Sequence, residues 1–250
     1  MCMKGAKILV GCPVYSGKKY ITPYWIESVK NLDYPNFDIL VVDNSQTSKQ
    51  FENIFEKEGI TVKKSPYLNN PFERLAKARQ ALNDYAIKNN YDYLLSIEQD
   101  VIVPKNLIKE LLKHKKEIIG APYIVSSHTN KKRRHIDYII SSSKLSKEHM
   151  RIDGVSVNEW YLTKEVEGKG LLQVKSCSLG CTLISTKILK EIPVRINLDI
   201  LRADDSYFFQ DCYDRGIPIF LDTSFLWKIF HIKRLGGELQ VGKELKKKNG

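Results

Sequence analysis

The sequence predicts an α/β fold in which helices flank an open, mostly parallel sheet. Three apolar segments, residues 7–15, 37–44 and 93–97, have the length and composition of buried strands and end in Gly, Pro or acidic residues. Segments with apolar residues at helical spacing, 22–35 and 71–89, lie between them. This alternation is typical of a parallel sheet, which binds ligands at the carboxyl ends of its strands.

The same alternation predicts a helix at 51–58, a strand at 60–64, a helix at 106–115 and a strand at 117–125. The pattern then weakens, and we expect a mobile insertion or an acceptor-side loop between residues 126 and 170. Further along, the pattern predicts strands at 171–174 and 181–184, a helix at 186–191, a helix that follows Asp204 and Asp205 and is capped by Gly216, and a final strand at 217–221.

Length and charge limit the possible classes of protein. A chain of 250 residues with 42% hydrophobic residues is long enough for one large α/β domain, and no linker interrupts it. Forty Lys and Arg residues against 29 Asp and Glu residues give a net charge of +11. Such an excess suits anionic partners, namely nucleotide phosphates, nucleic acid or an acidic membrane face. Much of it lies at 131–134 and 243–248, which can also be solvated surface.

The five cysteines lack a CxxC pair, and Cys177 and Cys181 stand in an apolar context without a histidine partner. We therefore expect buried thiols rather than zinc ligands, and a reducing, cytoplasmic location. The first residues are too short and too polar to be a signal peptide, and no apolar run approaches the roughly 20 residues of a membrane span.

Acidic residues at the ends of predicted elements are the first candidate site residues. Glu98, Gln99 and Asp100 follow the strand at 93–97. Carboxylates at the end of a buried strand require a neutralising cation, and Mg²⁺ or Mn²⁺ prefers their oxygens together with those of phosphate. Asp100, with Glu98, is therefore a candidate metal ligand. The alternative is a solvated turn that closes the strand.

Two later features have alternative interpretations as well. Asp204 and Asp205 precede a predicted helix, where acidic residues also serve as caps and interact favourably with the helix dipole. His231 stands alone in the apolar segment 227–231, and a histidine in such a context is commonly structural.

Taken in order, these segments resemble the GT-A glycosyltransferases, in particular the inverting, family-2-like type, over residues 7–231. The resemblance implies one catalytic domain at 1–235, with a nucleotide-binding half at 1–125 and an acceptor-side half at 126–235, followed by a basic tail at 236–250. The features that carry the resemblance are Pro13-Val14-Tyr15 after the first strand, Asp43-Asn44-Ser45 after the second, the helix segment Ala76-Lys77-Ala78-Arg79, Glu98-Gln99-Asp100 in place of Asp-x-Asp, Asp204-Asp205 followed by Phe208, and His231.

The resemblance also implies a role for each of these positions. The residues expected to bind the nucleotide are Pro13, Val14, Tyr15, Asp43, Asn44, Arg79 and Gln99. The residues expected to bind Mn²⁺ or Mg²⁺ at the donor diphosphate are Asp100, His231 and Glu98. Asp205, or Asp204 if the alignment shifts by one residue, would be the general base for a single inverting displacement. Glu98 departs from the usual aspartate, which weakens its assignment as a direct ligand.

The implied donor is a UDP- or GDP-sugar, and the acceptor is a glycan, a lipid-linked molecule or a protein. A sugar nucleotidyltransferase is an alternative, but residues 11–17 lack the glycine density of that class, although Lys18 and Lys19 follow. A nucleic-acid-binding protein is a second alternative, motivated by the net charge; the aromatic residues favour a core, so no nucleic acid is expected. The basic segments could instead contact an anionic membrane peripherally.

Overall fold

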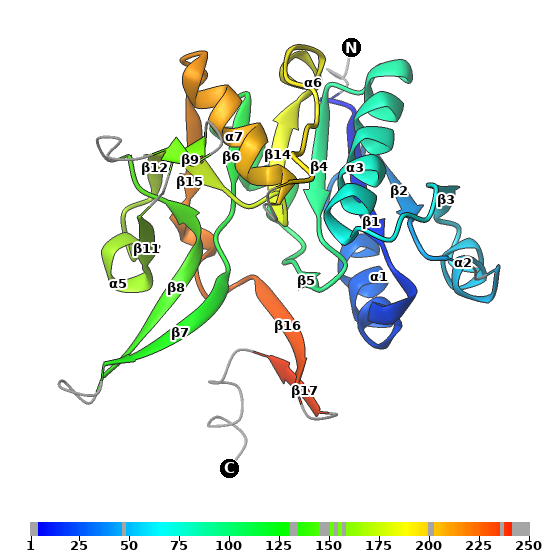
Figure 1. Ribbon diagram of the computed structural model, residues 1–250, viewed down its shortest axis with the longest axis horizontal. Helices are drawn as coiled ribbons and strands as arrows, with labels where there is room; N and C mark the ends of the chain where they lie inside the picture. Colours follow the sequence, from blue (N-terminus) through cyan, green and yellow to red (C-terminus); the bar gives the residue numbers. More distant parts are fainter. Residues whose placement is uncertain are drawn as a thin grey trace.

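In the computed structural model, the protein is built on a central sheet of eight strands (Figure 1). The structure describes residues 5–46, 49–130, 135–145, 151–152, 155–156, 159–199, 203–235 and 238–241. In spatial order the strands are β12 (Leu171–Val174), β15 (Ile219–Asp222), β6 (Ile118–Gly120), β14 (Cys181–Ser185), β4 (Tyr93–Ile97), β1 (Ile8–Val14), β2 (Phe37–Asp43) and β3 (Thr61–Lys64). Strands β4, β1, β2 and β3 run parallel, as does the pair β6 and β15, whereas β14 and β12 are antiparallel to their neighbours. The predicted mostly parallel sheet is confirmed.

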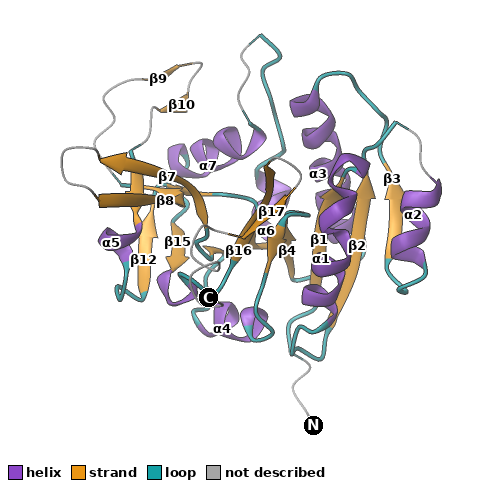
Figure 2. Cartoon of the chain, turned by 90° about the horizontal axis from the view of Figure 1, so that it is seen from below, coloured by secondary structure: helices purple, strands orange, loops and turns teal. Residues whose placement is uncertain are grey.

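Helices cover both faces of this sheet (Figure 2). Alternate residues of β1 explain why, because Ile8, Val10 and Cys12 belong to one apolar cluster while Leu9 belongs to the other. The first face carries α1 (Thr22–Lys30), α2 (Lys49–Glu56) and α4 (Leu107–Lys113), and the second carries α3 (Pro71–Lys88), α6 (Thr186–Glu191) and α7 (Asp204–Asp214).

Local sequence explains where helix α3 begins and where helix α7 ends. The side chain of Asn70 accepts hydrogen bonds from the backbone N–H groups of Phe72 at 2.9 Å and Glu73 at 3.2 Å, and Pro71 fills the first turn of α3. Helix α7 ends at Asp214, and Gly216, two residues later, has a left-handed φ of 69° that suits glycine. Both termini agree with the predicted helices.

The expected single strand at 117–125 is wrong in one respect, because it forms two strands. Strand β6 ends at Gly120, and β7 (Ile124–Asn130) begins after Pro122. Proline has no N–H group to donate to a strand neighbour, so a sheet tolerates it poorly at an interior position. The chain leaves the central sheet there, and β7 pairs antiparallel with β8 (His135–Ser143).

The loop expected between residues 126 and 170 is largely a second, antiparallel sheet. The segment includes the polar run Ser141–Ser143, which looks like a loop in sequence, but Ser142 and Ser143 are buried and hydrogen-bonded. Ser142 Oγ donates to the Ser176 carbonyl at 2.7 Å, and the Oγ atoms of Ser143 and Ser176 lie 2.5 Å apart. Residues 131–134 lie outside the described part. Besides β7 and β8, the region contains β9 (Arg151–Ile152), β10 (Val155–Ser156), β11 (Trp160–Leu162) and α5 (Thr163–Val166), and β13 (Ser176–Cys177) joins the same sheet.

Two further strands, β16 and β17, follow the strand at 217–221 that was expected to be the last. The 3-10 turn η2 (Thr223–Phe225) leads into β16 (Phe230–Leu235), which pairs with β5 (Val101–Ile102) and with β17 (Glu238–Val241). The hairpins β7–β8 and β16–β17 both project from the same side of the body (Figure 1). The expected domain boundary at 235 therefore falls within a hairpin, and the basic residues 243–248 lie outside the described part.

The four cysteines that the structure describes are free and buried, as expected for structural thiols; they are Cys12, Cys177, Cys181 and Cys212. Within the described residues, no helix has both the length and the apolar composition needed to cross a bilayer.

Replacing Leu95 tests the central position of β4. Leu95 is fully buried in the apolar core, so Leu95→Ala should lower the free energy of unfolding by about 2–5 kcal/mol through lost burial and an unfilled cavity. The matched control is Leu171→Ala, a strand leucine that is 37% exposed and should cost about 1 kcal/mol or less. Urea unfolding monitored by circular dichroism measures both. Equal losses would contradict the assignment of β4 as the core strand.

Candidate active site

The predicted site residues begin at the carboxyl edge of the sheet, where β1 and β2 end side by side. Val14 lies opposite Asp43 in the parallel register, and the Asn44 N–H donates to the Val14 carbonyl at 3.0 Å. This register places the end of β1 next to Asp43, the last residue of β2. Pro13 and Val14, which were expected in the loop after the first strand, belong to β1 itself. Pro13 is buried with Val14.

Gln99 ties the first loop to the acidic segment after β4. Its Oε1 accepts a hydrogen bond from the Tyr15 N–H at 2.9 Å, and its Nε2 donates to Thr22 Oγ1 at 2.9 Å and to the Lys18 carbonyl at 3.3 Å. The side chain is buried, so these contacts fix the loop rather than present an amide to solvent. Its assignment as a nucleotide-binding residue remains a prediction.

Asp43 is fully buried, and its charge is compensated by a lysine that the sequence did not single out. Lys64 Nζ, at the end of β3, donates to Asp43 Oδ2 at 2.5 Å, and the Ser45 N–H donates to Asp43 Oδ1 at 2.9 Å. The neighbouring Asn44 Oδ1 is buried without a hydrogen-bond partner. At this end of the edge, the Asp43 carboxylate is paired with Lys64, and the neighbouring Asn44 Oδ1 can accept a hydrogen bond.

An arginine between two tyrosines borders the same region and was missed from the sequence. The guanidinium carbon of Arg74 lies 4.9 Å from the ring centre of Tyr15 and 4.9 Å from that of Tyr67. Arg74 Nη1 also donates to the Leu68 carbonyl at 2.8 Å. Tyr15 is 38% exposed, so its ring offers an aromatic face at the surface.

Asp100 and His231, 131 residues apart in sequence, meet because β16 pairs with β5. His231 lies opposite Val101 in that pairing, and the Ile232 N–H donates to the Asp100 carbonyl at 2.8 Å. His231 Nε2 is 3.4 Å from Asp100 Oδ2, and Lys18 Nζ donates to the same oxygen at 2.7 Å. Burial alone would raise the pKa of Asp100, but His231 and Lys18 hold that pKa at about 2, so the carboxylate is charged.

Arg79 is the second cationic centre, and it joins α3, the end of β4 and the start of α7. Its Nη2 donates to Glu98 Oε1 at 2.6 Å, and its Nε lies 3.2 Å from Asp204 Oδ2. Burial opposes the charge of the guanidinium, but Asp204, Glu98 and Asp205 together raise the pKa of Arg79. Glu98 is thus engaged with Arg79, and its assignment as a metal ligand remains a prediction.

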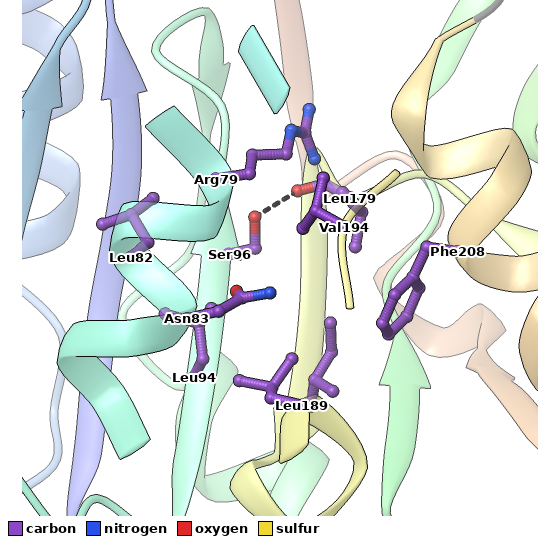
Figure 3. Close-up of a pocket in the computed structure, with 10 residues that line it drawn as sticks. Arg79, Leu82, Asn83, Leu94, Ser96, Leu179, Leu189, Val194 and Phe208 are labelled. Carbon is purple, nitrogen blue, oxygen red and sulfur yellow. Dashed lines mark hydrogen bonds between the residues drawn. The ribbon is translucent and has the colours of Figure 1, made fainter. Parts of the chain in front are cut away.

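A small cavity lies behind Arg79, between α3, β4, β14 and α7 (Figure 3). Its volume is about 20 Å³, room for a single water molecule. Ser96 Oγ donates to the Leu179 carbonyl at its edge, at 2.6 Å. The other lining residues are mainly apolar, so this cavity is part of the core behind the site and not a ligand pocket.

Asp204 and Asp205 lie in the first turn of α7, whereas the sequence pattern placed them just before the helix. Asp204 is buried against Arg79, whereas Asp205 is only partly buried. Burial and the adjacent charge of Asp204 raise the pKa of Asp205 to about 7, and Arg79 opposes that rise. Burial likewise raises the pKa of Asp204, against the effect of Arg79.

Tyr123 lies between the Asp100–His231 pair and Glu98, and the sequence analysis did not identify it as a site residue. Its ring centre is 5.3 Å from that of His231, and its hydroxyl donates to Ser178 Oγ at 2.8 Å. Burial and the charge of Glu98 raise the pKa of the Tyr123 hydroxyl. Gly180 packs so closely that an added Cβ would lie 2.0 Å from the Tyr123 oxygen.

Unpaired buried polar atoms gather in this region. Within the described residues, nine buried side-chain nitrogen or oxygen atoms lack a hydrogen-bond partner, and seven of them belong to predicted site residues. Buried polar groups rarely remain unpaired unless a ligand, an ion or water satisfies them. The seven atoms are Asn44 Oδ1, Arg79 Nε and Nη1, Asp100 Oδ1, Asp204 Oδ1 and Oδ2, and His231 Nδ1. Two of them, Arg79 Nε and Asp204 Oδ2, form an ion pair with each other at 3.2 Å.

Asp100 and His231 fit a divalent cation as a pair of ligands. One carboxylate oxygen and one imidazole nitrogen there lack hydrogen-bond partners, and Mn²⁺ accepts both ligand types. No group of three or more His, Cys, Asp or Glu side chains in the described part of the chain could hold a metal ion. The two residues would therefore anchor an ion that takes its remaining ligands from substrate oxygens or water.

The fold, with helices on both faces of a mostly parallel sheet and acidic residues at the strand ends, is that of a GT-A glycosyltransferase. The sequence model of glycosyl transferase family 2 matches residues 10–192, which is most of the chain. The chain therefore belongs to glycosyl transferase family 2. No curated protein matches its sequence.

Solved structures support the fold. S. aureus TarS 1-349 in complex with UDP-GlcNAc aligns with a TM-score of 0.53 and 18% identity, covering 87% of this chain and 55% of that one. A longer S. aureus TarS chain gives a TM-score of 0.51 and 14% identity, and this protein spans 87% of its own length but only 35% of that chain. A197 from STIV covers 94% of this chain and 93% of its own at 12% identity, with a TM-score of 0.45 that supports no conclusion.

Removing Arg79 should destabilise the fold in a pH-dependent way. Arg79→Met leaves the buried Asp204 and the half-buried Glu98 without their cation, which should lower the free energy of unfolding by about 3–5 kcal/mol near neutral pH. The pKa of Asp204 and Asp205 should rise further in the folded variant, so the folded state binds protons more tightly than the unfolded state. The loss should consequently be larger at pH 8 than at pH 5.

Urea unfolding of the wild type and of Arg79→Met at pH 5 and pH 8 measures the loss of stability and its pH dependence. The control is Arg195→Met, because Arg195 pairs with Asp211 at an exposed position and its removal should cost about 1 kcal/mol or less at either pH. A loss for Arg79→Met that does not depend on pH would contradict the buried pairing.

Proposed function

We propose that this protein transfers a sugar from a nucleoside-diphosphate sugar to an acceptor hydroxyl, with inversion at the anomeric carbon. The observation that carries the proposal is the meeting of Asp100, His231, Arg79 and Asp205 at one edge of the sheet, with unpaired polar atoms gathered among them. Membership of glycosyl transferase family 2 supplies the reaction class. The UDP-GlcNAc bound by TarS supports a UDP-sugar as the first donor to test, and GDP-sugars are the alternative.

The nucleoside would bind along the ends of β1 and β2. The unpaired Asn44 Oδ1 lies there and suits a hydrogen bond from a base or ribose hydroxyl. Asp43, which is fully buried and engaged by Lys64 and Ser45, would hold this end of the edge in place. The exposed ring of Tyr15, backed by Arg74 and Tyr67, offers a stacking surface for the base. Tyr15, Asp43 and Asn44 are among the residues that the resemblance predicts to bind the nucleotide, and that role stays a prediction.

The diphosphate would lie between the two cationic centres. Arg79 is fixed by Glu98 and Asp204, so it offers a preorganised positive charge without further ordering. Asp100 and His231 would hold Mn²⁺ or Mg²⁺, and a bound divalent ion would neutralise the charge that develops on the departing nucleotide. A divalent cofactor is therefore part of the proposal.

Asp205 is the proposed general base. Its raised pKa, about 7, makes it a better proton acceptor than an ordinary carboxylate while leaving much of it ionised at neutral pH. It would take the proton from the acceptor hydroxyl as that oxygen attacks the anomeric carbon. One displacement of this kind inverts the configuration, and Asp204 would keep Asp205 basic by its adjacent charge.

Nucleotide binding is the first test. Calorimetric titration should show binding of UDP or GDP in the presence of Mn²⁺ or Mg²⁺, at least tenfold weaker when EDTA removes the metal. Asp100→Asn should abolish the difference between the two conditions. The control, Asp33→Asn, removes an exposed acid that pairs with Lys109 and should leave the difference unchanged. Failure of both nucleotides to bind with any metal would end the proposal.

Asp205→Asn tests the base. The variant should bind the donor with wild-type affinity, yet release nucleotide during transfer about 10²- to 10⁴-fold more slowly with a glycan panel as acceptor. The wild-type kcat/KM should rise about tenfold per pH unit below pH 7, because only ionised Asp205 accepts the proton. Asp211→Asn, in the same helix, is the control. Full activity in Asp205→Asn would refute the assignment.

A further inference from the structure

Lys18 places a positive charge at the carboxylate that the proposed metal ion needs. Lys18 Nζ lies 2.7 Å from Asp100 Oδ2, the oxygen that His231 Nε2 approaches at 3.4 Å. The chain thus supplies its own cation at this carboxylate.

The backbone of Lys18 is held in place from two sides. Its N–H donates to the Tyr15 carbonyl at 2.9 Å, and its own carbonyl accepts from Gln99 Nε2 at 3.3 Å. Lys18 departs from helical geometry inside the 3-10 segment η1 (Ser16–Ile21), with φ −100° and ψ 17°. Gln99 directly precedes Asp100, so the same contact that fixes the loop also directs the lysine toward the carboxylate.

The two partners differ in their access to solvent. The Lys18 side chain is 43% exposed, whereas that of Asp100 is only 8% exposed. A lysine has a flexible stem of four carbons, so its ammonium can leave Asp100 by rotating toward solvent without moving the backbone. Arg79 lacks this freedom because it is buried between Glu98 and Asp204.

Electrostatics makes the two cations exclusive at this position. A divalent ion bound to Asp100 and His231 would lie within a few ångströms of the Lys18 ammonium, and like charges at such distances repel strongly when partly buried. Asp100 also cannot compensate three positive charges, and Glu98, the other carboxylate whose charge acts on Lys18, is engaged with Arg79. Entry of the ion therefore requires Lys18 to move, and a diphosphate beside the ion is the nearest anion that could accept it.

We propose that Lys18 is a positioning residue that competes with the divalent cation for Asp100 and transfers to the donor diphosphate when the cation enters. This inference rests on the proposed nucleotide-sugar transfer. It makes metal and donor bind cooperatively: the ion alone must displace Lys18, whereas the ion and diphosphate together provide the lysine with a new partner. Because binding coupling is reciprocal, the nucleotide should raise metal affinity by the same factor as the metal raises nucleotide affinity.

Manganese binding to the full chain tests the proposal without measuring activity. Electron paramagnetic resonance of free Mn²⁺ gives the metal affinity, with and without saturating UDP or GDP, whichever binds. In Lys18→Met, Mn²⁺ alone should bind at least tenfold more tightly than in the wild type, and the factor by which nucleotide raises that affinity should fall at least tenfold. Lys18→Arg keeps the charge and should remain within about threefold of the wild type.

Lys19→Met is the matched control, because it removes the same charge from the next, exposed residue. It should leave both affinities unchanged. An unchanged or weaker Mn²⁺ affinity in Lys18→Met would overturn the competition, as would an equal gain in Lys19→Met. These outcomes are distinguishable from failure of the proposed function, in which neither nucleotide binds to the wild type with any metal. Retained nucleotide binding by Lys18→Met shows that the variant is folded.

Discussion

A guanidinium buried among carboxylates is the interaction on which the rest of the site depends. Arg79 comes from α3, Glu98 from the end of β4 and Asp204 from the first turn of α7, and the three meet at distances of 2.6 and 3.2 Å. A charge removed from water is tolerated only when its partners are in place, so this contact requires the three elements to dock together. The same arrangement sets Asp205 beside a buried carboxylate, which gives it the raised pKa proposed for a base.

Asp100 forms a second charged centre with different properties. Its partners reach it through a strand pairing, β5 with β16, and through a loop held by Gln99, and one of them is a partly exposed lysine. The site therefore combines a fixed cation at Arg79 with an exchangeable one at Asp100. A fixed charge can orient a diphosphate, whereas an exchangeable charge allows a metal ion and a substrate to arrive and leave together.

The sequence predicted the elements whose apolar period is regular and the acids that end them. It could not predict partners that meet only through tertiary pairing: Lys18 on Asp100, Lys64 on Asp43, Arg74 between two tyrosines. It also missed the second sheet, because buried serines such as Ser143 satisfy one another across strands and look like a loop in sequence. Pro122 interrupted an apolar run whose composition alone favoured one continuous strand. Local pattern determines elements, whereas cross-strand satisfaction of polar groups requires the assembled fold.

Glu98, which departs from the expected Asp-x-Asp motif, lies close to Gly180. Glu98 stands where an aspartate is expected, and its carboxylate reaches Arg79 rather than the Asp100 centre. Gly180 lies beneath it: an added Cβ would fall 3.1 Å from Glu98 Oε2 and 2.0 Å from the Tyr123 hydroxyl. Tyr123 therefore needs the space that glycine leaves at position 180, whereas the Glu98 carboxylate would have to shift by only a few tenths of an ångström. The glutamate thus pairs with Arg79, while the proposed metal site consists of Asp100 and His231.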